Sequence, residues 1–374
     1  SLSAWGNALD VNADLMIYGC NLAGSAQGEQ FVAELAQITG ADVAASDDNT
    51  GYALLNGDWE LEYRHGDIET SVAVSEDLQA SWSGVLVSFS VDTNADTADA
   101  NPGDGLAQDA SGNTSLRAAI EEANALGGAD TISIGAGTFT LSGGQLSISS
   151  DITITGAGAD QTFIDGASLS RIFDITSGTV TISDLTITNG SLSGDRGAGV
   201  QIWNSATVEL TNVVVSGNST TGAVCTAQGG VIRNLGSLTM DNVRITVNHA
   251  DGQGGGLFNQ GTAIITSSLV DATTSGDMGA GIRNTGANAD LTLTNVTISG
   301  NTSADDGAGL SNSADAVLYN VTVTQNSATG GAATGGGIAE ALASASTIIT
   351  NSIIQENLAA GGSPDADGTY ESQG

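Results

Sequence analysis

Apolar and polar residues alternate along most of the chain between Thr131 and Asn357. Apolar side chains are separated by Thr or Ser, as in the segment Leu291-Thr292-Leu293-Thr294. Because a period of two residues is that of a β-strand, the alternation predicts short strands. Gly and Asn interrupt the alternation at regular intervals, and both are typical of tight bends. The pattern therefore predicts many short strands joined by sharp corners.

The predicted strands belong to a unit that repeats every 25 to 30 residues. One position of the unit is occupied by Asn204, Asn234, Asn259, Asn284, Asn312 and Glu340. Two further rows are Asn212, Asn242, Asn295, Asn320 and Asn351, and Asn218, Asn248, Asn301, Asn326 and Asn357. A period of this length indicates a repeat architecture, in which neighbouring units share one apolar interior. We therefore predict a right-handed parallel β-helix of about eight or nine coils, with like side chains stacked in ladders.

A sandwich of antiparallel hairpins is the alternative all-β fold. It would show a turn about every 8–12 residues without a longer period. The longer period is present, and no Pro occurs between residues 131 and 357. Since Pro cannot donate a hydrogen bond to a neighbouring strand, its absence suits a continuous sheet. Both observations favour the β-helix.

Two other segments differ from the repeats. An apolar run at 14–18, helical spacing over 26–39 and a second apolar run at 41–45 predict a strand, helix and strand of a parallel α/β sheet. Residues 114–124 place three apolar side chains on one helical face, which suits a short helix capping the β-helix. We predict a partial α/β domain (1–86), a linker and N-terminal cap (87–130), the β-helix (131–358) and a truncated tail (359–374).

Composition narrows the range of partners. The chain has 42 acidic residues against 7 basic ones, all of them Arg, and a net charge of −35. Such a surface repels nucleic acid and anionic membranes and attracts divalent cations. No apolar run approaches the length of about 18 residues that spans a bilayer. We expect a monomer with no nucleic-acid partner and no membrane insertion in this chain.

Cys20 is the candidate nucleophile of the N-terminal segment. It follows an apolar run and precedes the predicted helix, whose N-terminus would lower the pKa of its thiol. A nucleophile also needs a base, and neither His65 nor His249 stands at a matching place. The other interpretation is a small buried residue at a strand end. We therefore predict no peptidase activity for this chain, and two cysteines are too few for a disulfide framework.

The N-terminal segment resembles a known domain. The similarity rests on Tyr18-Gly19-Cys20-Asn21, Gly57-Asp58-Trp59 and Trp82-Ser83-Gly84. It is similar to the C-terminal part of a domain of unknown function in very large bacterial surface and secreted proteins. That domain resembles caspase-like cysteine peptidases, which would make Cys20 catalytic in a complete domain. The earlier His-Gly segment of that pattern is absent from this sequence.

Residues 114–119 read Thr114-Ser115-Leu116-Arg117-Ala118-Ala119. They are similar to the CSLREA motif of bacterial extracellular β-helix proteins, which are pectin-lyase-like, with Thr114 in place of Cys and Ala118 in place of Glu. The resemblance covers the chain from about residue 87. The preceding Asn101-Pro102-Gly103-Asp104-Gly105 also belongs to the pattern. The resemblance implies an extracellular or cell-surface protein whose secretion signal is not in this chain. Without the Cys, we expect packing alone to hold the cap.

A row of acidic residues precedes the corner glycines of successive coils. It comprises Asp251, Asp277, Asp305 and Asp306. In register, these carboxylates would stack about 5 Å apart and repel one another unless a cation screened them. Calcium, which takes six to eight oxygen ligands, is the candidate cofactor. The alternative is that Asp is simply common in turns.

A second group of residues suggests a carbohydrate site. Arg233 and Arg283 precede matched asparagines two coils apart, Phe258 lies between them, and Trp203 lies on the preceding coil. The arginines would be about 10 Å apart on one face, and Arg serves as base in some polysaccharide lyases. The alternative is that these residues are solvated and face outward.

These observations give a leading function and an alternative. The leading prediction is a fragment of a large secreted or cell-surface protein whose β-helix is an adhesive or structural stalk. It requires no cofactor, and its partner is a carbohydrate or a cell surface. The alternative is a polysaccharide lyase or glycoside hydrolase acting on an acidic polysaccharide. Release of unsaturated or reducing ends would separate the two.

Overall fold

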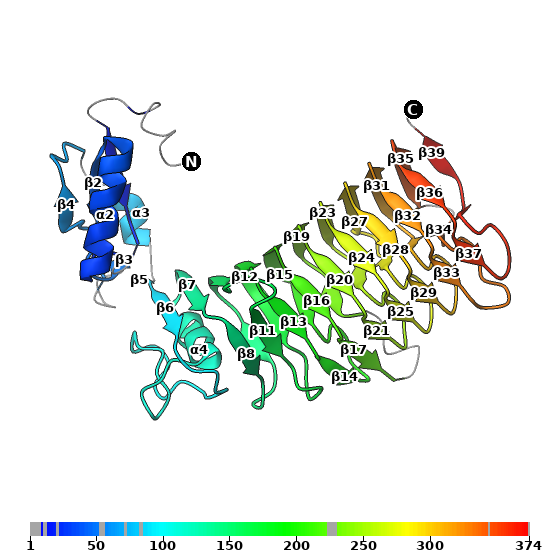
Figure 1. Cartoon of the computed structure of the whole chain (residues 1–374), viewed down its shortest axis with the longest axis horizontal. Coiled ribbons are helices and arrows are strands. Elements are labelled where there is room, and N and C mark those ends of the chain that lie inside the picture. Colours follow the sequence, from blue (N-terminus) through cyan, green and yellow to red (C-terminus); the bar gives the residue numbers. More distant parts are fainter. Residues whose placement is uncertain are drawn as a thin grey trace.

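The computed structural model describes residues 9, 13–19, 22–51, 57–70, 73–81, 85–222, 230–342 and 345–372. Across these residues the chain forms a long rod of parallel coils with a small α/β module beyond its N-terminal end (Figure 1). The rod is a parallel β-helix, so the predicted fold class is confirmed. Among the described residues, no helix is long and apolar enough to span a membrane.

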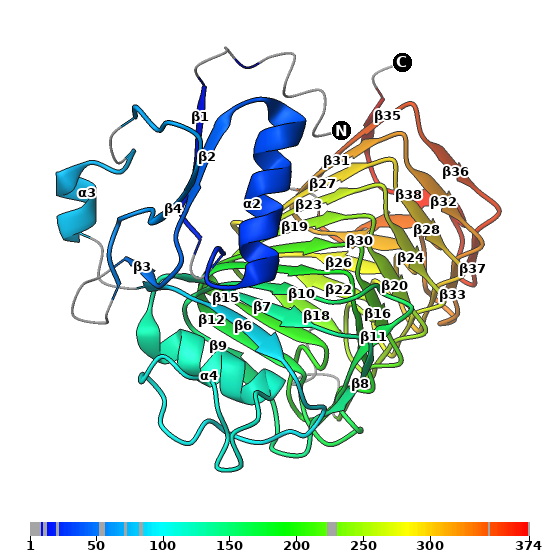
Figure 2. The ribbon, with the colours of Figure 1, turned by 60° about the vertical axis from the view of Figure 1, so that its left-hand side comes forward.

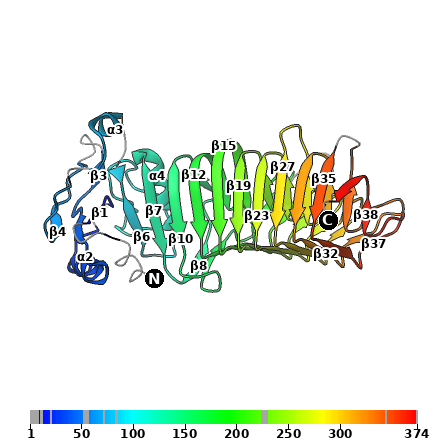
Figure 3. The same ribbon diagram turned by 90° about the horizontal axis from the view of Figure 1, so that it is seen from above.

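One face of the rod is an 18-stranded sheet, here named the long sheet, whose strands lie side by side along the rod (Figure 3). Most coils contribute an earlier strand, which we assign to a first ladder, and a later strand, which we assign to a second ladder. Strands β12 (Phe173–Ser183) and β15 (Val200–Thr211) run through both. The first ladder also contains β9 (Leu146–Ile148), β18 (Ile232–Asn234), β22 (Leu257–Asn259), β26 (Ile282–Asn284), β30 (Leu310–Asn312), β34 (Ile338–Glu340) and β38 (Ala366–Asp367). The second contains β6 (Ser88–Val91), β7 (Ala129–Ile134), β10 (Asp151–Thr155), β19 (Ser237–Asp241), β23 (Thr262–Thr266), β27 (Asp290–Thr294), β31 (Asp315–Tyr319), β35 (Ser346–Thr350) and β39 (Tyr370–Ser372).

The other two faces of the rod are a nine-stranded and a seven-stranded parallel sheet. The nine-stranded sheet contains β8 (Gly137–Thr140), β11 (Thr162–Asp165), β13 (Thr186–Thr188), β16 (Val214–Ser216), β20 (Arg244–Thr246), β24 (Leu269–Asp271), β28 (Thr297–Ser299), β32 (Thr322–Thr324) and β36 (Ile353–Gln355). The seven-stranded sheet contains β14 (Ser191–Ser193), β17 (Ser219–Thr221), β21 (His249–Ala250), β25 (Thr274–Ser275), β29 (Thr302–Ser303), β33 (Ser327–Ala328) and β37 (Leu358–Ala359).

The second ladder is longer than the predicted eight or nine coils. Its eleven strands, from β6 to β39, are joined by consecutive parallel pairings. The prediction was low because the repeat pattern was counted from Thr131 to Asn357. Both β6, in the predicted linker, and β39, in the predicted tail, add rungs outside that span.

A single apolar interior runs through the coils. In the second ladder, Leu210, Met240, Ile265 and Leu293 occupy one register row, and each is fully buried. On each strand, the residues directly before and after this buried residue point outward, as the alternation in the sequence predicts. Because each coil covers the apolar side chains of its neighbour, the units are stable only as a stack.

Two corners of the rod carry asparagine rows. At the outer corner, between the second ladder and the nine-stranded sheet, Asn212 and Asn295 have left-handed backbone with φ of 54° and 55°. Asn tolerates this conformation better than most residues, which explains its recurrence there. At the inner corner, between the nine- and seven-stranded sheets, Asn301 donates to Asn326 at 2.8 Å and Asn326 donates to Asn357 at 2.9 Å. The predicted asparagine ladders are therefore confirmed.

Helix α4 (Leu116–Leu126) covers the N-terminal end of the rod beside β6, β7 and β9 (Figure 2). Ser115 caps the helix by accepting a hydrogen bond from the Ala118 N–H at 3.0 Å. The predicted capping helix is confirmed, but packing alone does not hold it. Arg117 forms an ion pair with Asp96 at 2.8 Å and donates to the carbonyl of Gln145 at 3.0 Å.

The module contains the predicted strand, helix and strand. Strands β1 (Asp14–Ile17) and β2 (Asp42–Ala45) are parallel, and α2 (Ala26–Thr39) lies between them in sequence. The other elements are β4 (Tyr63–His65), antiparallel to β2, the pair β3 (Thr50–Gly51) and β5 (Val85–Leu86), and α3 (Glu76–Ser81).

Candidate functional site

Trp203 lies on β15, between the parts of that strand that belong to the two ladders. Its side chain is 42% exposed although it is large and apolar. The indole Nε1 donates a hydrogen bond to Asp174 Oδ1 at 2.9 Å. Because this bond fixes one edge of the ring, the exposed indole is held in one orientation. We name this exposed ring the Trp203 platform.

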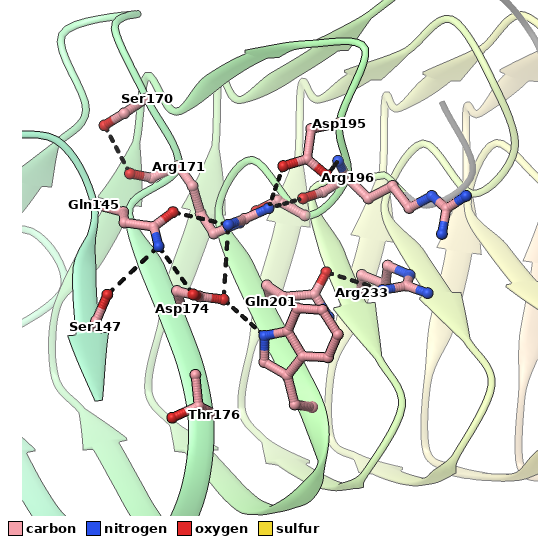
Figure 4. Close-up of polar contacts among 12 residues, drawn as sticks. Gln145, Ser147, Ser170, Arg171, Asp174, Thr176, Asp195, Arg196, Gln201 and Arg233 are labelled. Atoms are coloured by element: carbon pink, nitrogen blue, oxygen red, sulfur yellow. Dashed lines mark hydrogen bonds and ion pairs between the residues drawn. The ribbon is translucent and has the colours of Figure 1, made fainter. Parts of the chain in front are cut away.

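A polar network around Arg171 holds Asp174 in place (Figure 4). The buried guanidinium of Arg171 donates to Gln145 Oε1 at 2.8 Å and to Asp195 Oδ2 at 3.0 Å, and lies 3.6 Å from Asp174. Gln145 in turn donates to Asp174 Oδ2 at 2.9 Å. The Trp203 indole, the Gln145 amide and the Arg171 guanidinium therefore surround the Asp174 carboxyl with donors. The network makes the support of Trp203 rigid.

Arg233 lies on the next coil and is also buried, with 8% of its surface exposed. It donates to Gln201 Oε1 at 3.2 Å and to Gln260 Oε1 at 3.3 Å, and its Nε has no partner among the described residues. Burial, followed by repulsion from Arg196, lowers the pKa of Arg233 to about 10. The guanidinium is still protonated at neutral pH, so Arg233 is not poised as a base.

Arg283 and Phe258 are covered as well, at 6% and 1% exposure. Arg283 donates to Ser311 Oγ at 3.0 Å, and burial lowers its pKa. The expectation that the two arginines are solvated is wrong, and Phe258 offers a ligand almost no surface. The row Arg233, Phe258, Arg283 does lie in register, as predicted from the repeat.

The corner glycines explain this burial. Gly254 and Gly279 have φ of +69° and +66°, and a Cβ on either would lie 3.0 Å from the Cβ of Phe258 or Arg283. Only Gly allows the loop before each strand to fold over the outward face of that strand. The recurring Gly before each strand was the sequence signal for this cover.

Trp203 is not aligned with the arginine row. The structure pairs Gln201 with Arg233 and Ile202 with Asn234, whereas the sequence repeat had matched Asn204 with Asn234. Trp203 therefore lies two positions beyond Gln201, the residue that is aligned with the arginine row, and its indole is bonded to Asp174 on the preceding coil. Paired residues are 32 positions apart in the first ladder (Val200 and Ile232) and 30 apart in the second (Thr207 and Ser237), so the register changes between the two parts of β15. The repeat in the sequence gave no signal for this change.

The acidic edge is only partly formed. Asp277 and Asp305 lie at equivalent positions of neighbouring coils, since the Asp305 N–H donates to the Asp277 carbonyl at 3.4 Å. Asp251 is one position out of register, opposite Gly276. Burial, then repulsion from Asp306, raises the pKa of Asp305.

The clusters of three acids whose oxygen atoms converge lie in the module, within the part of the chain that the structure describes. They are Asp14, Asp42 and Glu69, and Asp47, Asp48 and Glu62. The predicted calcium ligands of the rod belong to neither cluster. Sequence analysis missed the clusters because their members come together only through the folding of the module.

Cys20 lies outside the described residues. Of the two histidines, His65 is exposed on β4. His249 is bonded through Nε2 to Asp251 at 2.9 Å and through Nδ1 to Thr274 at 2.8 Å. The role of Cys20 stays a prediction.

Comparisons with known proteins give one family match to part of the chain and two distant structural similarities. Residues 1–86 match the model of a domain of unknown function (DUF4347). A crystal structure of the pectate lyase Pel9A is similar at 14% identity, with a TM-score of 0.39 over 75% of this chain and 78% of that one. ORF18 of Geobacillus virus E2 is similar at 12% identity, with a TM-score of 0.35 over 96% of this chain and 73% of that one. A comparison with curated protein sequences found no match.

Proposed function

We propose that the chain is part of a secreted or cell-surface protein in which the β-helix is an adhesive stalk that binds glycans. The observation that carries this proposal is Trp203, which is 42% exposed and held in place by Asp174. A fixed aromatic ring is suited to stacking on the apolar face of a sugar, because it loses little conformational freedom on binding. The polar groups at its edge suit sugar hydroxyl groups.

The continuity of the rod supports the role of a stalk. Backbone hydrogen bonds and the apolar interior pass from coil to coil without a break in the second ladder. Bending such a rod would require separating strands from one another. It would therefore hold a binding surface at a fixed distance from the module.

The burial and hydrogen bonding of Arg233 and Arg283 support glycan binding rather than glycan cleavage. Arg233 and Arg283, the candidate bases of a lyase, are buried and bonded to neutral side chains. A general base must reach the proton that it removes. We therefore propose a protein that retains a glycan without turning it over.

The test is binding of wild-type protein and the Trp203→Ala variant to a panel of neutral and acidic polysaccharides. We expect affinity to fall about tenfold on loss of the ring. Tyr319→Ala is the matched control, since Tyr319 is 47% exposed but lies on β31, far along the rod. Equal binding by Trp203→Ala and wild type would reject the platform, and release of unsaturated or reducing ends would favour the lyase or hydrolase.

A further inference from the structure

A groove of about 740 Å³ runs along the outer corner of the rod. We name it the outer groove, and its lining residues are Ala159, Asn212, Val213, Val214, Asn242, Val243, Arg244, Ser267, Ser268, Leu269, Asn295 and Thr297. These residues come mainly from four successive coils, which span about 14 Å at the usual strand spacing. The volume is in the range of ligand sites, and Trp203 does not line it.

One wall of the outer groove is the exposed asparagine row, and this row is broken. Asn242 donates to Asn212 Oδ1 at 2.8 Å, and Asn320 donates to Asn295 Oδ1 at 3.0 Å. Between these two pairs stands Ser267, whose side chain is too short to continue the ladder. Within residues 230–342, no protein group bonds to Asn242 Oδ1 or to Asn295 Nδ2. The break therefore exposes one acceptor and one donor on either side of Ser267.

Backbone geometry gives no reason for the break. Ser267 has a φ of 49°, close to the 52° of Asn242 and the 55° of Asn295. Asn is the non-glycine residue best suited to this left-handed conformation. An Asn at position 267 would both fit the backbone and complete the ladder, so the Ser leaves hydrogen-bonding capacity open at the centre of the groove.

The floor of the groove combines apolar and neutral polar surface. Val214 and Leu269 lie at equivalent positions on either side of Arg244 along the nine-stranded sheet. The Arg244 guanidinium is paired with Asp271 at 2.9 Å, so its charge is compensated. A ligand here would meet aliphatic side chains below and amide groups at the side.

These features select the chemistry of the ligand. An extended peptide binds a sheet by adding to a free edge, whereas β16, β20, β24 and β28 are each paired on both sides. A polyanion would be repelled by a chain of net charge −35. Sugar hydroxyl groups can both donate to Asn242 Oδ1 and accept from Asn295 Nδ2. A pyranose ring is also about as long as the spacing between two coils.

We propose that the outer groove binds a neutral glycan chain that lies along the rod and bridges Asn242 and Asn295 across Ser267. The apolar faces of its rings rest on Val214 and Leu269. This site is separate from the Trp203 platform, and neither requires the other.

The test uses the whole chain and a panel of neutral hexasaccharides (cellohexaose, mannohexaose, xylohexaose and laminarihexaose), with binding measured by calorimetry. The key variant is Ser267→Asn, which completes the ladder and fills the break. We expect at least one hexasaccharide to bind wild type, and Ser267→Asn to bind it about tenfold more weakly, as expected for the loss of one or two hydrogen bonds. The melting temperature of this variant should be equal to or above that of wild type.

Two further variants complete the design. Asn351→Ser shortens the same row beyond Asn320, at a residue that neither lines the groove nor bonds to Asn242 or Asn295, and should leave affinity unchanged. Leu269→Ser removes apolar floor and should weaken binding in a protein that remains folded by its melting curve. The proposal is overturned if no neutral hexasaccharide binds at millimolar concentration, if Ser267→Asn binds as well as wild type, or if hexagalacturonate or an extended peptide binds the groove instead. Loss of binding in Trp203→Ala alone would concern the platform and not the groove.

Discussion

The coils and the N-terminal cap bury polar side chains in different ways. At the inner corner of the coils the buried groups are neutral amides: Asn301 donates to Asn326 Oδ1 at 2.8 Å and to the Val270 carbonyl at 3.1 Å. In the cap they are carboxylates. Asp130 is fully buried and accepts one hydrogen bond, from the Val87 N–H at 2.9 Å, and its Oδ2 has no partner among the described residues.

The difference follows from the hydrogen-bonding groups that lie next to the buried side chain in the coils and in the cap. A coil in the middle of the rod has a similar coil on either side, so the Asn301 amide can donate to Asn326 on one neighbour and accept from Thr273 on the other. At the cap the next coil is missing, and the free groups are backbone N–H donors. Carboxylates can accept hydrogen bonds from these backbone N–H groups. Glu122, for example, accepts from the N–H groups of Gly103 and Gly105. Repetition thus gives a neutral amide ladder at the inner corner, and the end of the repeat gives buried titratable groups.

The largest effect should come from breaking an inner ladder. Asn301→Ala leaves the Thr273 N–H and the Val270 carbonyl without their side-chain partner in a buried corner, while Asn326 Oδ1 keeps the backbone N–H of residue 301. Each unpaired buried group is costly, and we expect the free energy of unfolding to fall by about 4–5 kcal/mol. Urea denaturation measures it. A loss below about 1 kcal/mol would show that water replaces the amide and that the ladder is not essential.

The cap should make stability depend on pH. Burial, assisted by Glu122, raises the pKa of Asp130 from 3.8 to about 7 in the folded state. Because its pKa is raised in the folded state, Asp130 binds its proton more tightly there than in the unfolded chain. Protonation of Asp130 therefore stabilises the fold fully below about pH 4, and this stabilisation is lost as pH rises through about 7. Asp130→Asn keeps the acceptor for Val87 and carries no charge.

We therefore expect the variant Asp130→Asn to be more stable than wild type at pH 8 by about 3–4 kcal/mol, and equal to it at pH 4. Thermal melts of both proteins across this range measure the difference. Parallel curves at every pH would mean that Asp130 does not titrate in this window.

The exposed asparagine row should matter less than the buried one, although both arise from the same repeat. Asn320→Ala removes one exposed amide that donates to Asn295. Because water can satisfy the groups left behind, we expect a loss of about 0.5–1 kcal/mol. Comparison with Asn301→Ala in the same urea titration isolates the effect of burial, and equal losses would contradict this explanation.

Calcium should have the smallest effect. Asp277 and Asp305 are in register but Asp251 is not, so the edge offers a cation fewer ligands than the sequence predicted. We expect calcium to raise the melting temperature by about 2 °C or less, with reversal by a chelator. The variant Asp305→Asn should abolish this shift in melting temperature. Identical melts of wild type with and without chelator would show that calcium does not stabilise the protein.

The sequence by itself determined the rod. Alternation with a period of two set which side chains face inward, and the repeat of 25 to 30 residues set the coil, because both are local properties of the chain. The helix 116–126 was also predictable from its spacing and from Ser115 at its start. The corner asparagines follow from the left-handed backbone that each bend requires.

Only the tertiary structure decided which of these residues are available for function. Arg283 and Phe258 have outward positions in the repeat, yet a loop made possible by Gly254 and Gly279 covers them. The repeat misassigned the register of Trp203 by two residues, and this side chain is exposed. Exposure depends on how loops fold over neighbouring coils, and a repeat pattern describes the strands but not the path between them.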